Sequence, residues 1–290
     1  MKNSKVAANF ISDFEGLKFK LSSLSVLLNA QAKLIESIGT ESNIDLYQKE
    51  DAIGLILKLN CQMLTFLKIV KNQLNDQDQV YDISSLQMIL RSSYEAYLIF
   101  HYIFVNPETL ELREFRYLCW DIAGYTTREN MPATTLEHQK RKDREKTNKA
   151  IQISKINKNP FFIKLSAKKQ NALLSRSNWK PNVTWADLSE IAGFDRKTYS
   201  SIYSMLCDHS HSGRLSITQF MQSFRNKEMS ITHIMSLLNT SCAMLAKSVS
   251  DLQKSANTNI EFTNAENSSI FFWTTIGNSL GKKITTIQQP

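Results

Sequence analysis

Turn-forming residues are scarce in this chain, and their scarcity is the strongest constraint on its fold. The 290 residues include only 8 Gly and 5 Pro. Sheets joined by hairpins need many residues that fix or tolerate a turn, whereas long helices need few. The sequence therefore predicts an all-α fold: a multi-helix bundle with long antiparallel helices around a central buried helix.

Apolar residues recur every three or four positions along much of the chain, a spacing typical of amphipathic helices. Gln31 and Asn60 each fill one slot of this apolar pattern. A helix that reaches Val105 is apolar on nearly every side from Leu86 onward, so we expect it to be the central one. The other long helices are predicted at about 5–38, 46–74 and 227–252.

Shorter helices are predicted between the long ones. Thr184 and Asp195 are typical N-cap residues, each just before a short helix. No convincing linker interrupts the chain. We expect a single helical domain at residues 1–256, with a basic segment at 138–180 packed on it or partly mobile, and then a C-terminal tail at 257–290.

The composition is that of an ordinary globular protein, with 42% hydrophobic and 21% charged residues. The most apolar run, at 97–105, is about half as long as a membrane span. No signal-peptide pattern is visible at the start. The four cysteines are far apart and lack metal-ligand spacing. We expect a cytoplasmic protein that does not act at a membrane, without a metal or another cofactor.

Positive charge is concentrated in one part of the chain. The window from His138 to Lys180 holds thirteen Lys/Arg against two acids, a net charge of +11, while the whole chain carries +8. Such a window is either a solvated helix face or the contact surface for a polyanion. On the second interpretation the nucleic-acid-binding residues are Lys140, Arg141, Lys142, Arg144, Lys168, Lys169 and, further along, Arg214.

Two polar motifs are candidates for catalysis. Arg91 and Glu95 are four residues apart, so they share one face of the expected central helix, either as a structural ion pair or as the polar centre of a cleft. The second motif runs from Tyr203 to Arg214 at a helix end and contains Asp208, His209 and His211. Histidine moves protons near neutral pH, but it also caps helix ends. The candidate catalytic residues are His211, His209, Arg91, Glu95, Tyr203 and Asp208.

Both motifs resemble those of an uncharacterised family of bacterial helical proteins. The family pattern R-S-x-x-E-A corresponds to Arg91 through Ala96, and Y-x-x-L-S-x-x-V-H-x-S corresponds to Tyr203 through Gly213. The match spans roughly residues 86–214 and aligns His211 with the family histidine. This chain has Cys207 for the usual Ser, Ser210 for Val and Gly213 for the final Ser.

That family is similar in architecture to the HEPN helical bundles, many of which are ribonucleases or toxins of bacterial defence systems. The HEPN motif has four to six residues between Arg and His, whereas the nearest such pair here, Arg225 and His233, has seven. The resemblance implies a HEPN-like protein that binds RNA or another polyanion and cuts it without a metal. His211 would be the base or acid, with His209 as its partner. Arg91 would be the phosphate clamp, and Glu95 would orient Arg91 or a histidine.

The alternative is a non-catalytic interaction module, in which the same polar residues stabilise the bundle. A partner protein or a second copy of the chain would then bind it. The sequence also lacks the glycine-rich phosphate loops and the G-x-S-x-G motif, which disfavours nucleotide hydrolysis and α/β-hydrolase chemistry.

Overall fold

The computed structural model describes residues 2–40, 46–75, 81–175, 179–181 and 183–279. These residues form twelve α-helices, one π-helical segment and no strand, which confirms the predicted all-α bundle. The contacts divide the chain into two compact units. Unit 1 comprises Met1–His101 and Ser189–Pro290, and unit 2 comprises Tyr102–Leu188.

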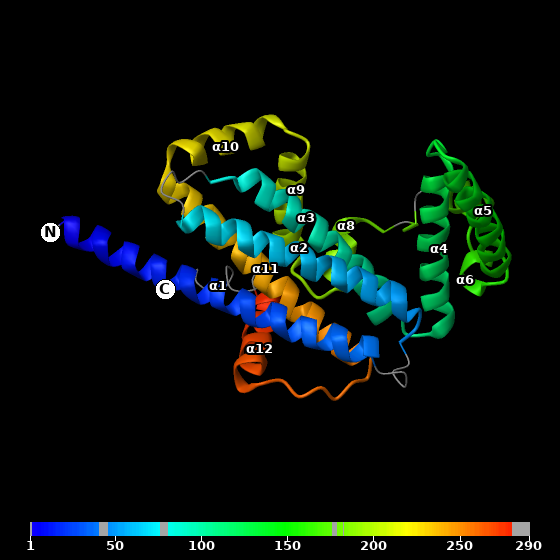
Figure 1. Ribbon diagram of the computed structural model, residues 1–290, viewed down its shortest axis with the longest axis horizontal. Coiled ribbons are helices and arrows are strands. Elements are labelled where there is room, and N and C mark those ends of the chain that lie inside the picture. The colour runs from blue at the N-terminus through cyan, green and yellow to red at the C-terminus, as the bar shows by residue number, and fades with distance from the viewer. Residues whose placement is uncertain (1, 41–45, 76–80, 176–178, 182, 280–290) are drawn as a thin grey trace, which may run out of the picture. The chain divides into compact units, whose positions relative to one another are not determined.

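Unit 1 is a bundle in which long helices pair along their lengths. In Figure 1, α11 (orange) lies along α1 (blue), and α2 lies along α3. The α10 and α9 helices form a corner against α3. The helices of unit 1 are α1 (Lys2–Thr40), α2 (Lys49–Asn75), α3 (Ile83–Phe100), α9 (Arg196–Ser210), α10 (Arg214–Arg225), α11 (Lys227–Ser255) and α12 (Asn264–Ser279); α8 (Trp185–Ile191) crosses the boundary between the units.

The centre of unit 1 is shared by α3 and α11. The α3 helix buries Leu86, Leu90, Tyr94 and Tyr97, and it contacts α2, α9, α10 and α11. The sequence predicted this central position. The α11 helix is buried along most of its length and contacts α1, α3 and α12. A π-helical segment, η1 (His101–Val105), continues directly from α3.

The polar slots in the apolar pattern form a buried network. The Asn60 Nδ2 atom on α2 donates to the Oε1 atom of Gln31 on α1 at 3.1 Å. The Gln31 Nε2 atom donates in turn to the Oγ atom of Ser248 on α11 at 2.7 Å. Buried amides need such partners, because an unpaired polar group in a core costs about 1–3 kcal/mol. The network therefore fixes how α1, α2 and α11 meet.

The α2 and α11 helices are long and apolar enough to cross a membrane by length and composition alone. The α2 helix buries one face within unit 1, and α11 is buried on most sides. The core helix of a bundle passes the same test, because it is apolar on most sides.

Part of the predicted tail is the helix α12, which packs on α1 and α11. Trp273 is buried, and its ring stacks on Phe19 of α1 at a centroid distance of 6.2 Å. The Lys33 Nζ atom on α1 lies 2.6 Å from the Oε1 atom of Glu266. The other Glu266 oxygen accepts hydrogen bonds from the backbone N–H and hydroxyl of Thr263, so it also caps α12.

We expect α12 to lose part of its stabilisation in acid. Burial alone would raise the pKa of Glu266, but the hydrogen bonds from Lys33 and Thr263 outweigh it and lower that pKa below its usual value of 4.5. A carboxyl whose pKa is lowered by folding stabilises the fold fully above the unfolded-state pKa, and this contribution is lost as the pH falls through the folded-state pKa.

Urea unfolding followed between pH 7 and pH 2.5 measures this loss. The variant Lys33→Met should be less stable than the wild type at pH 7 and should converge with it at the acid end. Two curves that stay parallel over the whole range would show that the Lys33–Glu266 pair does not cause the pH dependence.

Unit 2 is a smaller helical assembly built on α4. Apolar residues of α4 meet those of α5, α6 and α7 at one end of the α4–α5 pair, in a core of Phe115, Leu118, Cys119, Ile122, Ile156, Phe162 and Leu173. The helices are α4 (Leu110–Glu129), α5 (Leu136–Ile156), α6 (Pro160–Ile163) and α7 (Ala167–Ser175), and the first three begin at the N-caps Thr109, Thr135 and Asn159.

Candidate functional site

Arg91 and Glu95 form the ion pair that their spacing on α3 predicts. The Arg91 Nε atom lies 3.2 Å from the Glu95 Oε1 atom, and each side chain is about one-quarter exposed, at 25% and 26%. The pair therefore lies at the edge of the core and not at its centre. Partial exposure lowers the desolvation cost that a fully buried pair would have to overcome.

Tyr203 on α9 completes this polar centre. Its hydroxyl donates to the Glu95 Oε1 atom at 2.7 Å, and its ring lies 5.9 Å from the Arg91 guanidinium carbon. Burial and the hydrogen bond to Glu95 raise the pKa of Tyr203. Burial alone would lower the pKa of Arg91, but Tyr203 and the Glu95 carboxylate outweigh it, so that pKa is raised. The centre holds its charges in place, and a phosphate bound to Arg91 would have to compete with Glu95.

His209 is buried and bridges three helices. Its Nε2 atom lies 3.0 Å from the Gln219 Oε1 atom on α10, and its Nδ1 atom lies 3.2 Å from the Ser84 Oγ atom on α3. An amide oxygen only accepts, so Nε2 donates to Gln219, and Nδ1 is paired with the serine hydroxyl. Both ring nitrogens are engaged in holding α9 to its neighbours.

Asp208 has a structural position at the corner between α9 and α10. Its Oδ2 atom accepts a hydrogen bond from the Ser216 backbone N–H at 2.7 Å and so caps the first turn of α10. The residue at the N-cap position, Gly213, has no side chain to do this. The Gly213 N–H donates to the Asp208 carbonyl, and Ser212 has a φ of 51°, which together make the Schellman ending of a helix.

Gly213 is required at this corner for space. A Cβ atom at residue 213 would lie 1.8 Å from the Asp208 Oδ1 atom. We expect Gly213→Ala to displace the carboxylate, remove the cap of α10 and destabilise the protein by about 1–3 kcal/mol in urea unfolding.

A double-mutant cycle identifies the cause of that loss. In an Asp208→Ala background the added methyl group has no carboxylate to displace, so Gly213→Ala should cost much less there. Ser212→Gly serves as a control. Ser212 has a left-handed backbone conformation that glycine adopts without strain, so this substitution should stabilise the protein slightly. Equal costs in both backgrounds would contradict the close contact as the cause.

His211 lies at the C-cap of α9, and its side chain is exposed. Its backbone N–H donates to the carbonyls of Cys207 and Asp208. We expected His211 to meet Arg91 and Glu95 in one polar centre. Within the described residues, it is Tyr203 that forms a hydrogen bond with Glu95 in this centre. No hydrogen bond or ion pair there joins the His211 side chain to Arg91 or Glu95. Tyr203 precedes His211 by eight residues, a rise of about 12 Å along a helix.

A further polar cluster in unit 1 was not predicted. The Tyr97 hydroxyl on α3 donates to the Asp251 Oδ2 atom on α11 at 2.7 Å, and the His101 Nε2 atom lies 3.8 Å from the same oxygen. Burial and the nearby Asp251 carboxylate raise the pKa of Tyr97. Lys247 precedes Asp251 by one turn, and burial lowers the pKa of its ammonium group. The four-residue spacing within Tyr97–His101 and Lys247–Asp251 is the one signal in the sequence that could have found it.

The residues of the basic segment lie in unit 2, on α5 and α7. Lys140, Arg141 and Arg144 are exposed on α5, and Lys168 and Lys169 are exposed on α7. Lys142 is half-buried, and its Nζ atom donates to the Met131 carbonyl at 2.8 Å. Arg214, the remaining predicted nucleic-acid contact, is on α10 and belongs to unit 1.

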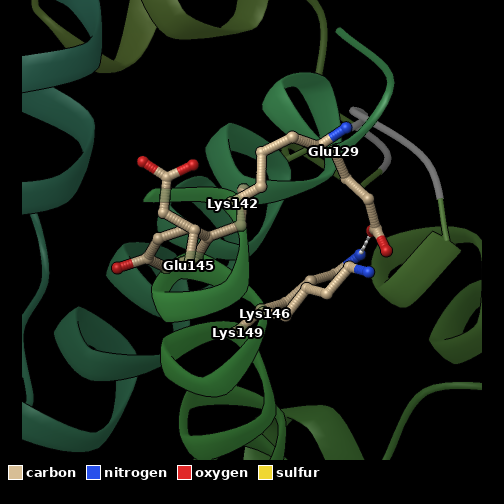
Figure 2. Close-up of a pocket in the computed structure, with 6 residues that line it drawn as sticks. Glu129, Lys142, Glu145, Lys146 and Lys149 are labelled. Carbon is tan, nitrogen blue, oxygen red and sulfur yellow. Dashed lines mark hydrogen bonds and ion pairs between the residues drawn. The ribbon is translucent and has the colours of Figure 1, made fainter. Parts of the chain in front are cut away.

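Three lysines of α5 surround an acid on α4. The Lys149 Nζ atom lies 2.7 Å from the Glu129 Oε2 atom, and Figure 2 shows the Lys146 ammonium group beside this pair. The hydrogen bond from Lys149, followed by the charges of Lys146 and Lys142, lowers the pKa of Glu129. With Tyr125 and Glu145, these side chains line a small pocket. Three lysines and two glutamates therefore line this pocket, so its charged groups are mostly cationic.

Ion pairs hold this end of the α4–α5 pair, beyond the apolar core. Glu145 lies 3.1 Å from both Arg128 and Arg141, and Gln152 donates to Asp121 at 2.7 Å. Asp121, Glu129 and Glu145 are thus used in contacts between α4 and α5. Within the described ranges, no group of three His, Cys, Asp or Glu side chains could hold a metal ion.

These features define an all-α bundle protein that carries a strongly basic helical unit. The chain belongs to DUF5677, a family of unknown function, whose model matches residues 75–229, just over half of the chain. The match agrees with the resemblance to an uncharacterised helical family, and the matched region includes the whole of unit 2 and both polar motifs. No curated protein and no solved structure matches the chain.

Proposed function

We propose that the protein binds RNA or another polyanion through the basic surface of unit 2. One observation carries this proposal. Unit 2 holds sixteen Lys/Arg against nine Asp/Glu, a net charge of +7, while the whole chain carries +8. Almost the entire net charge therefore belongs to fewer than one-third of the residues, which is the charge distribution expected of a polyanion-binding unit.

The pairing of charges within unit 2 supports the proposal. Glu129 and Glu145 are engaged by Lys149, Arg128 and Arg141. None of the ion pairs among the described residues involves the exposed cations Lys140, Arg144, Lys168 or Lys169. Cations that are exposed and uncompensated can exchange their counterions for phosphates, and the release of those ions drives binding.

The polar centre of α3 and α9 has a structural role in this proposal. Arg91, Glu95 and Tyr203 satisfy one another, His209 bridges three helices, and Asp208 caps α10. A general base needs a free lone pair within reach of the substrate proton. Both ring nitrogens of His209 are engaged in this arrangement, and one Asp208 oxygen is used to cap α10, which favours a binding protein over an enzyme.

RNA cleavage of the HEPN type is a second candidate function, and one observation favours it. His211 and Arg214 are both exposed at the corner between α9 and α10, where a phosphodiester could approach them. A base and a cation beside a phosphate are the minimum for metal-independent cleavage. The protein would then be a HEPN-like ribonuclease or toxin of a bacterial defence system.

Fluorescence anisotropy with a labelled single-stranded RNA, measured from 50 to 300 mM salt, tests the first proposal. We expect affinity to fall steeply with salt, with a log–log slope of about 0.7 for each phosphate contact. The double variant Lys140→Glu/Arg144→Glu should weaken binding at least tenfold. The matched control, Lys58→Glu/Lys71→Glu on exposed positions of α2, makes the same charge change in unit 1 and should weaken binding much less.

Two results would overturn the proposal. Absence of RNA and heparin binding at 50 mM salt would remove polyanion binding altogether. Equal losses in the two double variants would show that net charge, and not the surface of unit 2, governs affinity. Cleavage of the same RNA that disappears in His211→Ala while binding persists would instead support the second candidate.

A further inference from the structure

The α10 helix is packed with its apolar side outward. Its exposed apolar residues are Leu215 (58%), Ile217 (51%), Met221 (39%) and Phe224 (59%). The residues it buries are two serines, Ser216 and Ser223, each 2% exposed. Burial of an apolar side chain stabilises a protein by about 1.5–3 kcal/mol. With its apolar residues exposed, α10 contributes less to stability than it would with those residues buried. Exposed apolar patches of this kind mark interaction sites.

Polar contacts explain why α10 sits this way. Ser216 receives the Asp208 cap and donates its hydroxyl to the Gly213 carbonyl. Gln219 holds His209, and Ser223 lies 2.9 Å from the Nδ1 atom of His233 on α11. The hydrogen bonds along one side of α10 therefore fix its outward face.

The outward face has the form of a shallow helix-binding surface. Ile217, Met221 and Phe224 are spaced by four and three residues, so they form one stripe. Ile217, Met221, Thr218, Gln222 and Arg225 line a hollow along it. The ring of Phe224 stacks on that of the half-buried Phe220, with the ring centroids 6.1 Å apart. Apolar stripes of this spacing bind amphipathic helices by their i, i+3, i+4 and i+7 residues.

The charged residues beside the stripe indicate what kind of partner could bind it. Arg214 and Arg225 begin and end α10, and the helix contains no Asp or Glu. In an antiparallel pair with a second copy, Arg214 would face Arg225, and in a parallel pair each Arg would face itself. Like charges across an interface suppress association, whereas opposite charges favour it. The hydrogen-bonding side chains Thr218 and Gln222 within the face suit a peptide better than lipid chains.

We propose that the outward face of α10 binds an acidic amphipathic helix of a partner protein. The partner would bury apolar residues against Ile217, Met221 and Phe224 and would place Asp or Glu near Arg214 and Arg225. This surface belongs to unit 1, so the proposal is independent of polyanion binding by unit 2.

Selection from a displayed library tests this proposal on the full-length protein. The library consists of 16-residue helical peptides with a fixed leucine stripe at i, i+3, i+4 and i+7 and with Glu, Gln or Lys allowed at each flanking position. We expect the peptides retained by the wild type to carry Glu at the flanks. Their affinity should fall at least tenfold in Met221→Ser/Phe224→Ser, and Arg214→Glu/Arg225→Glu should select Lys instead.

The matched control is Leu57→Ser/Leu64→Ser, which changes two exposed leucines of α2 and should leave peptide affinity unchanged. All four substituted apolar side chains are exposed, so we expect both variants to fold. Thermal unfolding verifies this. Attraction of acidic peptides to the basic unit 2 would not respond to Met221→Ser/Phe224→Ser, so this readout separates the two surfaces.

Three results would overturn the proposal. Selected peptides with random or Lys-rich flanks would exclude an acidic partner. Dimerisation in sedimentation equilibrium that is lost in Met221→Ser/Phe224→Ser would make the occupant a second copy. Binding to vesicles of phosphatidylglycerol and phosphatidylcholine that is lost in the same variant, without peptide binding, would make it a membrane surface.

Discussion

His209→Ala is expected to lower the free energy of unfolding by about 2–4 kcal/mol, whereas His211→Ala should change it by about 0.5 kcal/mol or less. The two histidines are separated by a single residue, yet their surroundings differ completely. His209 is buried and engaged at both ring nitrogens, and its loss leaves a cavity and an unpaired Gln219 oxygen. His211 is exposed at the helix end and loses only solvent contacts.

Urea unfolding of both variants at pH 7 measures the difference. His209→Gln offers a useful comparison, because its amide can replace one of the two hydrogen bonds and should recover part of the loss. If His211→Ala proved as destabilising as His209→Ala, then His211 would have a structural contact that its exposure does not indicate, and a catalytic role for it would lose its support.

Trp273→Ala should cost about 3–5 kcal/mol, the largest effect that we expect from a single substitution in α12. The indole is 3% exposed and joins α12 to Phe19 of α1. Without it, the remaining attachment includes the Lys33–Glu266 pair and the hydrogen bond of Lys247 to Asn278, both of which involve half-exposed groups. Removal of the indole should therefore release α12 from the bundle.

Limited proteolysis combined with urea unfolding measures this release. Cleavage within residues 257–279 should appear in Trp273→Ala well before the bundle unfolds. Phe271→Ala is the matched control, because Phe271 is 76% exposed and its removal should change neither measurement. Protection of residues 257–279 in Trp273→Ala would contradict the indole as the anchor of α12.

The long helices could be predicted from the sequence because their cause is local. The apolar spacing identified α1, α2, α3 and α11, and Asp195 caps α9 as its residue type indicated. The short helices α6 and α7 were not predicted, and neither were α10 and α12, for which the physical reasons are clear. The α10 helix buries serines and exposes apolar residues, the reverse of the usual pattern. The α12 helix lies in an Asn/Ser/Thr-rich stretch, and its docking depends on Trp273.

The same distinction separates the predictable part of the polar site from the rest. The Arg91–Glu95 pair spans one helical turn, so its spacing was sufficient. The contact of Tyr203 with Glu95 joins residues 108 positions apart, and only the packing of α9 on α3 creates it. The sequence also could not distinguish His209 from His211. Which of the two becomes buried depends on α10, which folds back over one side of the corner.

Unit 2 interrupts the chain of unit 1, and this has a consequence for synthesis on the ribosome. The α3 helix must pair with α9 and α11, yet residues 102–188 are made between them. At about 5–20 residues per second, that insertion delays the arrival of α9 by roughly 4 to 18 seconds. During this interval α1, α2 and α3 have emerged with apolar faces that await α11. The nascent α1, α2 and α3 helices therefore complete their packing only after the last third of the chain has been made.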